Sequence, residues 1–160
     1  VQYQQAQQTQ NLSPEQFAQI MARSYIFALA NGVEKLFYVN LVKAQFDPGA
    51  PFDERSALLN GSLQKTPMFY THRTIVEMLG DLDADDTVEI FTEKVGPWSI
   101  DTGQYKFVVD GKPIYALWGN GPLPPEIHGT VKITKMSGQA HTADAATVAL
   151  SAEPIFIEPL

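Results

Sequence analysis

The chain has 160 residues, a formal net charge of −7 and no cysteine. Its length allows one domain or two small ones. The negative charge argues against a nucleic-acid partner, which requires a basic face on the protein. The lack of cysteine excludes disulfides, thiol chemistry and zinc sites built from cysteine. No apolar run is long enough to span a bilayer, so we expect no membrane span. The sequence does not decide the cellular compartment of the protein, and secretion is one alternative.

The first predicted element is a helix that begins at Pro14. Ser13 can cap its first turn, Pro14 suits the first helical position, and Gln16 stands where a capping box places an amide. Gly32 can end the helix in a left-handed conformation. Residues 33–42 then form the run VEKLFYVNLV, which is nearly continuous in apolar side chains from residue 36 onward. Such a run is typical of a strand that is buried on both faces.

A long polar connection, residues 43–65, leads to a second predicted helix. Thr66 and Pro67 begin this helix by the same capping logic, and Gly80 ends it. Residues 81–86 form an acidic linker, DLDADD, which we take as a domain boundary. The predicted domains are therefore residues 1–80 and residues 81–160.

Beyond the linker the apolar period falls to two, which indicates β-strands. Asp110 and Gly111 together are a signal for a tight hairpin turn. The candidate strands are residues 87–95, 103–110, 112–118, 131–135, 146–150 and 154–158. The predicted fold class is α+β, with a helix–strand–helix unit followed by an antiparallel β-sandwich.

The helix–strand–helix unit is incomplete by itself. One such unit cannot bury a parallel strand on both faces, because the strand needs neighbours in a sheet. We therefore expect the partner strands of residues 36–42 to lie outside these 160 residues. A large apolar face should be exposed unless a missing amino-terminal part, or a second copy of the chain, covers it.

Residues that could carry chemistry are few and isolated. The histidines have no neighbours at metal-ligand spacing, so we expect neither a metal site nor a cofactor; they are His72, His128 and His141. Residues 81–85 alternate like a calcium loop but lack its glycine and its glutamate. Paired carboxylates are typical of glycoside hydrolysis, and the candidates, none of which has a buried setting, are Glu34, Asp47, Asp53 and Glu54. A hydrolase that uses Asp47 or Asp53 is one alternative.

Aromatic residues in the strand-rich half allow two interpretations. They could form a platform on which a sugar stacks, or they could be the apolar core of the sheet. Their places on alternating strands favour the core. They are Trp98, Tyr105, Tyr115 and Trp118.

The order of several segments resembles the carboxyl-terminal part of the (β/α)8-barrel glycoside hydrolases of clan A. The last helix and eighth strand of those barrels are similar to FAQIMARSYIFALANGVEKLFYVNL, and their final helix is similar to TPMFYTHRTIVEMLGDLD. The β-sandwich that follows them is similar to GKPIYALWG, GTVKITKMSGQ and TVALSAEPIFIE. The resemblance covers residues 14–158, and the nearest groups are the family 39 xylosidase-like and the cellulase-like enzymes.

The resemblance implies a retaining glycoside hydrolase with two catalytic glutamates, both upstream of Val1. No glutamate here matches either motif, so we assign no catalytic residue to this chain and expect it to be inactive alone. The implied role is to close the barrel, with a carbohydrate substrate in the intact enzyme and no cofactor. The alternative function is a stand-alone, non-catalytic β-sandwich that binds carbohydrate or protein.

The resemblance also gives residues 36–42 an orientation. The carboxyl end of a barrel strand faces the active site. We expect Tyr38 and Asn40 to point into the barrel and to be substrate-binding residues near its mouth. The structural alternative for Asn40 is that it ends the strand and bonds to the following loop.

Overall fold

The computed structural model describes residues 12–42, 56–83, 86–93 and 102–160. Two helices, α2 (Pro14–Ala30) and α3 (Pro67–Leu79), precede one antiparallel sheet in the described part of the chain. The strands of the sheet are β1 (Val88–Glu93), β2 (Gly103–Val109), β3 (Lys112–Trp118), β4 (Thr130–Lys135), β5 (Ala140–Asp144) and β6 (Ile155–Pro159). The predicted α+β class is confirmed.

Both predicted helices form, and their first turns use the predicted caps. The Gln16 amide N–H donates to Ser13 Oγ at 3.2 Å, and the Gln16 side chain accepts from the Ser13 N–H at 2.8 Å, which completes the capping box. Thr66 Oγ1 accepts from the Phe69 N–H at 3.4 Å at the start of α3. Gly32 follows α2 with a φ of 82°, the left-handed conformation that glycine adopts without strain.

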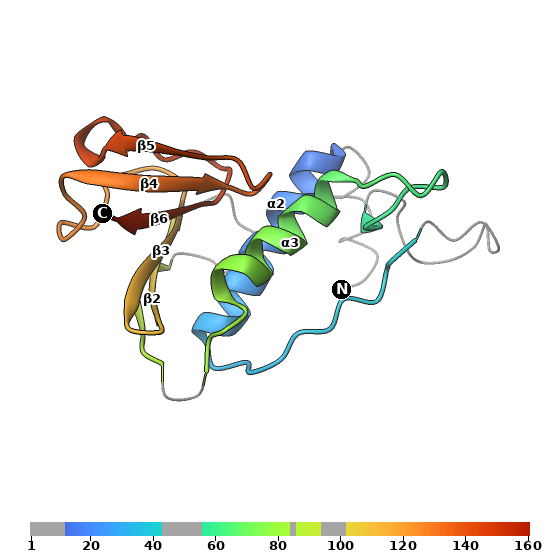
Figure 1. Ribbon diagram of the computed structural model, residues 1–160, viewed down its shortest axis with the longest axis horizontal. Helices are drawn as coiled ribbons and strands as arrows, with labels where there is room; N and C mark the ends of the chain where they lie inside the picture. Colours follow the sequence, from blue (N-terminus) through green and yellow to red (C-terminus); the bar gives the residue numbers. More distant parts are fainter. Residues whose placement is uncertain (1–11, 43–55, 84–85, 94–101) are drawn as a thin grey trace.

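The strands pair in the order β1-β2-β3-β6-β4-β5. The predicted hairpin joins β2 to β3, and its turn residues Asp110 and Gly111 have φ values of 51° and 73°. The last strand in sequence lies in the middle of the sheet, because β6 pairs with both β3 and β4. Figure 1 shows β4 and β6 crossing β2 and β3, so the sheet bends at β6.

One predicted strand, residues 146–150, is wrong. The structure instead has β5 just before it, followed by a short 3₁₀ helix, Ala145–Thr147. Asp144 starts that turn by accepting a hydrogen bond from the Ala146 N–H at 2.9 Å. An aspartate at such a position caps a helical turn and ends the strand. The strand β5 was missed because its side chains, AHTAD, are exposed or half-exposed and show no apolar alternation.

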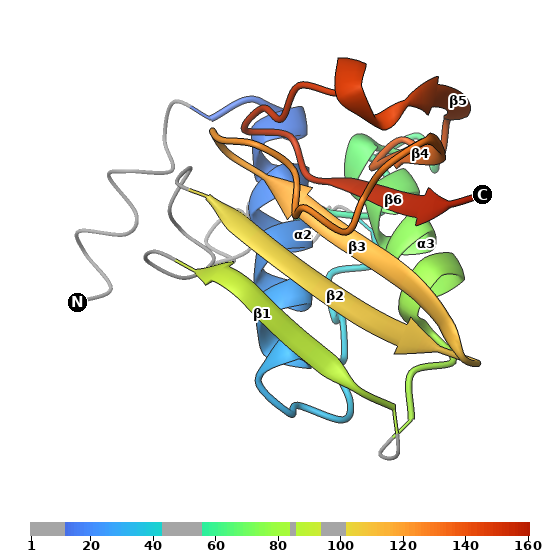
Figure 2. The ribbon, with the colours of Figure 1, turned by 90° about the vertical axis from the view of Figure 1, so that its left-hand side faces the viewer.

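The helices cover one face of the sheet, and both share a single apolar core with it (Figure 2). Tyr105, Phe107 and Trp118 from the sheet meet Ile26 and Met68 from the helices in this core. A second apolar cluster, around Leu117, Val131 and Ile157, fills the other face of the bent sheet. Because the helices and the sheet pack directly on each other, the boundary predicted after residue 80 stays a prediction.

Residues 33–42 lie on the side of the helices away from the sheet (Figure 1). Both helices run in the same direction in Figures 1 and 2, and the 33–42 segment runs back in the opposite direction. The segment is extended, and among the described residues its one ladder contact is a parallel bridge from Val42 to Leu59. The described part of the molecule therefore has three layers: sheet, helix pair and one extended segment.

Candidate functional site

The extended segment 33–42 has two chemically different faces. On one face Phe37, Val39 and Leu41 are 84%, 73% and 58% exposed. On the other face Leu36, Tyr38 and Asn40 are half-buried. Tyr38 contacts His72 of α3, and both Tyr38 and Asn40 hydrogen-bond to Ser56. This alternation is what an extended chain imposes, since successive side chains point to opposite sides. We call the Phe37–Val39–Leu41 side the outer face of the segment.

The backbone of the segment is mostly without hydrogen bonds. The carbonyls of Asn40 and Leu41 accept from the N–H groups of Leu58 and Leu59 at 3.1 and 2.9 Å. From residue 34 to residue 38, no backbone group hydrogen-bonds to another described residue. Unpaired N–H and C=O groups in an extended chain are a template for a neighbouring strand.

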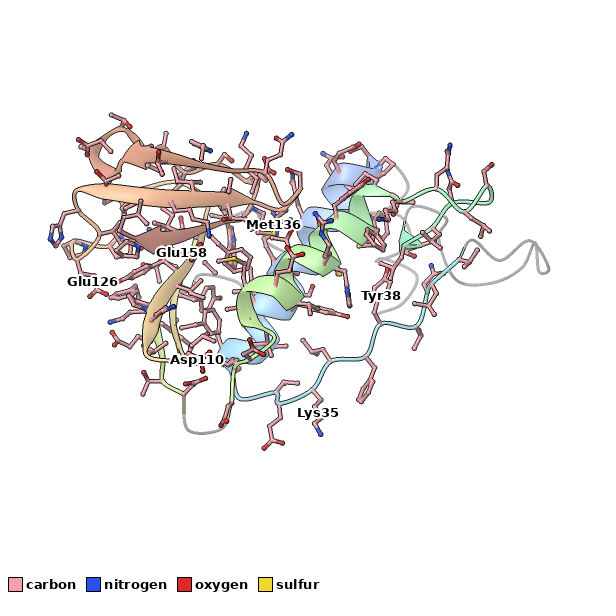
Figure 3. All side chains as sticks on the ribbon, in the orientation of Figure 1. Lys35, Tyr38, Asp110, Glu126, Met136 and Glu158 are labelled. Atoms are coloured by element: carbon pink, nitrogen blue, oxygen red, sulfur yellow. The ribbon has the colours of Figure 1, made fainter. Side chains whose placement is uncertain are left out.

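Tyr38 points toward α3. Its ring centroid lies 5.7 Å from that of His72, and His72 in turn makes an edge contact with Tyr25 of α2 at 5.9 Å. The Tyr38 hydroxyl donates to the Ser56 carbonyl. Figure 3 places Tyr38 far from Glu126 and Glu158 of the sheet. The Tyr25–His72–Tyr38 cluster thus joins the two helices to the segment.

Burial in this cluster changes its acid–base properties. Desolvation raises the pKa of Tyr38 to about 12, against which the bond to Ser56 acts in the lowering direction. Desolvation also lowers the pKa of His72 and raises that of Tyr25. Neutral side chains are favoured at all three positions, so the cluster suits packing better than proton transfer near neutral pH.

Asn40 also lies on the inner side, and the structural alternative predicted for it is confirmed. Its Nδ2 donates to Ser56 Oγ at 2.6 Å, and its carbonyl accepts from the Leu58 N–H. The amide needs a polar partner, and the loop after residue 55 supplies one. The prediction that Tyr38 and Asn40 point into a barrel is not tested, because no barrel is present among the described residues. Their role as substrate-binding residues stays a prediction.

The residues missed by sequence reasoning are those of the outer face. Period-two alternation had already separated Phe37, Val39 and Leu41 from Tyr38 and Asn40. The resemblance implies that the polar side chains face the interior of a barrel, whereas in the structure a serine in the adjoining loop satisfies the Asn40 amide. Ser56 itself carries no sequence signal for this contact.

The carboxylate candidates do not form a pair within the described residues. Asp47, Asp53 and Glu54 lie outside those residues. Glu34 is exposed and lines a pocket of about 550 Å³ with Lys35, Asp83 and Asp86, at the amino end of the segment. If residues 33–42 are the barrel strand that the resemblance implies, that end lies opposite to the active site.

The remaining candidate residues have structural surroundings. His128 Nδ1 lies 2.8 Å from the Glu126 carbonyl, and His141 is exposed on β5. Within the described ranges, no group of histidine and acidic side chains could hold a metal ion. Tyr105 and Trp118 are buried and stack on each other at 5.3 Å, and Tyr115 is also buried, as the core interpretation predicted. Trp98 lies outside the described residues.

Comparison with family models, with curated proteins and with solved structures finds no match to this chain. Among the described residues, no helix has the length and apolar character needed to cross a membrane.

Proposed function

We propose that this chain is the carboxyl-terminal segment of a retaining glycoside hydrolase, in which residues 33–42 close a (β/α)8 barrel and the sheet packs outside the barrel helices. The observation that carries the proposal is the extended segment itself. It has an apolar outer face, the backbone of residues 34–38 makes no hydrogen bond to another described residue, and helices cover its inner face. A strand in the wall of a barrel needs neighbours on both edges and an apolar interior in front of it.

The direction of the elements supports this proposal. In a parallel α/β structure, consecutive helices run the same way on one side of the strands, and each strand returns between them. The helices α2 and α3 run the same way, and the segment runs back in the opposite direction (Figures 1 and 2). A hairpin-based α+β fold has no need for this arrangement.

The exposed apolar side chains argue that something covers them. Burying a phenylalanine, valine or leucine side chain stabilises a protein by about 1.5–3 kcal/mol. Phe37, Val39 and Leu41 contribute little of that stabilisation while their side chains are exposed. In the proposed barrel they point into its interior, and Tyr38 and Asn40 lie between the strand and the helix layer.

Hydrogen bonds join the helices to the sheet side of the molecule. These bonds fit the proposal that the sheet packs on the outside of the barrel helices. Arg23 on α2 is 3% exposed, and its Nη1 donates to the Ala152 carbonyl at 2.8 Å. Thr74 on α3 is fully buried and donates to the Met136 carbonyl at 3.2 Å. The sheet thus covers one side of the two helices, and the extended segment 33–42 lies on the other side.

In this proposal the chain supplies no catalytic group. A retaining glycosidase needs two carboxyl groups about 5–5.5 Å apart, one as nucleophile and one as acid and base. Two described carboxylates on the sheet are in ion pairs, Glu158 with Lys132 at 2.7 Å and Glu89 with Lys106 at 3.0 Å. The two glutamates are proposed to come from strands upstream of Val1.

The test compares the chain alone with the product of its whole reading frame. Both are assayed on a panel of 4-nitrophenyl glycosides and treated with 2-deoxy-2-fluoroglycosides, which trap the covalent intermediate of a retaining enzyme. We expect turnover only in the longer protein and the trapped sugar on a carboxylate outside residues 1–160. In the longer protein, Phe37→Asp should abolish folding or activity, and Phe37→Leu should retain both.

Three outcomes would contradict the proposal. One is turnover by the chain alone that is lost in Asp47→Asn or Asp53→Asn. Another is a trapped sugar within these residues. The third is a monodisperse monomer in light scattering that binds no hydrophobic dye, because the outer face would then need no cover.

The alternative function, a stand-alone binding module, has less support from the sheet. Its predicted sugar platform is buried at Tyr105, Tyr115 and Trp118. A module that binds protein through the outer face would give a stable complex with no glycosidase activity in the longer protein, which the same assay detects.

A further inference from the structure

The sheet has a second pocket, on the face turned away from the helices. Tyr105 and Phe107 of β2 belong to the core under the helices, so their neighbour Gln104 lies on the opposite face. Gln104 lines a pocket of about 370 Å³ at the ends of β1 and β3. This volume falls within the range of about 300–1,000 Å³ that is usual for small-molecule sites. Glu126, just after the loop that walls the pocket, lies at the opposite end of the molecule from Tyr38 (Figure 3).

A β-bulge turns an aromatic side chain into this pocket. The register of β1 against β2 shifts between Ile90 and Thr92. A bulge brings two consecutive side chains, which would otherwise alternate, toward the same face. Phe91 and Thr92 accordingly both line the pocket. The Phe91 ring stacks on Tyr115 at 6.4 Å and still keeps 37% of its surface exposed.

The other wall of the pocket, residues 119–125, is fixed by hydrogen bonds. Thr102 Oγ1 donates to the Asn120 carbonyl at 2.8 Å and accepts from the Asn120 N–H at 3.3 Å. Gln104 Nε2 donates to the Pro122 carbonyl at 2.8 Å, and the Gly119 N–H donates to the Ser151 carbonyl at 2.6 Å. Three prolines in the wall restrict it further. A loop that is already ordered in the free protein loses less conformational entropy when a ligand binds.

The lining is uncharged, in a chain whose net charge is −7. None of the described residues that line the pocket is acidic or basic. On the same face of β2, Lys106 Nζ lies 3.0 Å from Glu89 and 3.1 Å from Glu126, so these charged groups are engaged with one another. Tyr115 also donates to the Glu126 carboxylate. The pocket therefore offers hydroxyls, amides and one exposed aromatic ring to a ligand.

We propose that this pocket binds a neutral saccharide. The hydroxyl and amide groups of Thr92, Thr102, Gln104 and Asn120 match the donors and acceptors of sugar hydroxyls, and the Phe91 ring offers an apolar surface to the C–H face of a pyranose. The site lies on a different face from residues 33–42 and does not require the barrel, so its failure would leave the proposed function standing.

The experiment is titration of the isotopically labelled chain with xylotetraose, cellotetraose and maltotetraose, followed by amide NMR. We expect shifts confined to residues around Phe91, Thr92, Gln104 and Asn120. Phe91→Ala should weaken binding about tenfold, because it removes the apolar contact. Asn120→Ala, at an exposed loop position, should weaken binding severalfold and leave the thermal midpoint unchanged.

The matched control is Ile90→Ala, since Ile90 is 45% exposed, lies next to Phe91 and pairs with Tyr105 on the helix side. It should leave the affinity unchanged. The proposal is overturned by an absence of shifts at millimolar sugar or by shifts elsewhere in the chain. It is equally overturned if tetragalacturonic acid or a proline-rich peptide binds this pocket and the neutral sugars do not.

Discussion

At the residue scale, a few close contacts decide how the sheet and the helices pack. Gly103 at the start of β2 is the clearest example, because the Trp118 indole lies where a side chain would be. A Cβ added at Gly103 would come within 2.1 Å of Trp118 Cζ2. The indole is 2% exposed and stacks on Tyr105, so it has no room to move.

The residue-scale prediction is that Gly103→Ala destabilises the chain. Overpacking of this kind costs about 1–3 kcal/mol in the free energy of unfolding. Urea unfolding followed by tryptophan fluorescence measures the change. The control is Val76→Ala, at a position on α3 that is 54% exposed, and its effect should be close to zero. Equal stability of the two variants would contradict this prediction, because it would show that the Trp118 indole can shift to make room for the added methyl group.

At the element scale, the extended segment 33–42 and the two helices behave as one unit. The Tyr25–His72–Tyr38 cluster takes one aromatic side chain from each element, and the outer face of the segment contributes nothing to it. Substitutions on the two faces should therefore have opposite consequences in the chain alone.

The first element-scale prediction compares Leu36→Ser with Val39→Ser. Leu36 is half-buried, so its loss should lower the free energy of unfolding by about 1–2 kcal/mol, less than the loss of a fully buried leucine. Val39 is 73% exposed, so its replacement should change stability little and reduce binding of a hydrophobic dye. Thermal melts and dye fluorescence measure both effects. A reversed pattern would mean that the face assignment is wrong.

The second element-scale prediction concerns pH. Burial lowers the pKa of His72 below its ordinary value of 6.5, so the unfolded chain binds more protons than the folded chain below that pH. Stability from this residue is present above about pH 6.5 and is lost as the pH falls toward the folded-state pKa. His72→Phe should therefore flatten the fall in melting temperature between pH 7 and pH 5.

The control for this pH series is His141→Gln, because His141 is exposed on β5. That variant should keep the wild-type slope of melting temperature against pH. If His72→Phe also keeps it, proton binding by His72 is not linked to folding.

At the scale of the whole molecule, the shared core makes the helices and the sheet interdependent. Tyr105, Phe107 and Trp118 of the sheet share one buried core with Met21, Ile26 and Met68 of the helices. The buried Arg23 joins α2 to the connection before β6 through the Ala152 carbonyl.

The whole-molecule prediction is that residues 86–160 do not fold alone. Removal of the helices would expose one complete apolar face of the sheet, and such a small domain has little stability to lose. Near-ultraviolet circular dichroism should show no ordered aromatic signal for the fragment, and gel filtration should show aggregation. A cooperative melt of the fragment would establish the boundary after residue 80 as a true domain limit.

The sequence by itself determined the elements whose signals are local. Helix caps at Ser13 and Thr66, the hairpin at Asp110–Gly111 and the alternation of β2 and β3 depend on neighbours within a few residues. It also determined that residues 33–42 are extended and apolar, and that Tyr105, Tyr115 and Trp118 are core.

Only the tertiary structure decided the features that depend on distant contacts. It put β6 between β3 and β4, assigned β5 to exposed residues with no apolar pattern, and turned Tyr38 and Asn40 toward the helices. Alternation separates the two faces of a strand but does not say which face is covered, since that depends on what packs there. The bulge at Phe91 and the pocket beside it likewise arise from the pairing of β1 with β2, which no local pattern specifies.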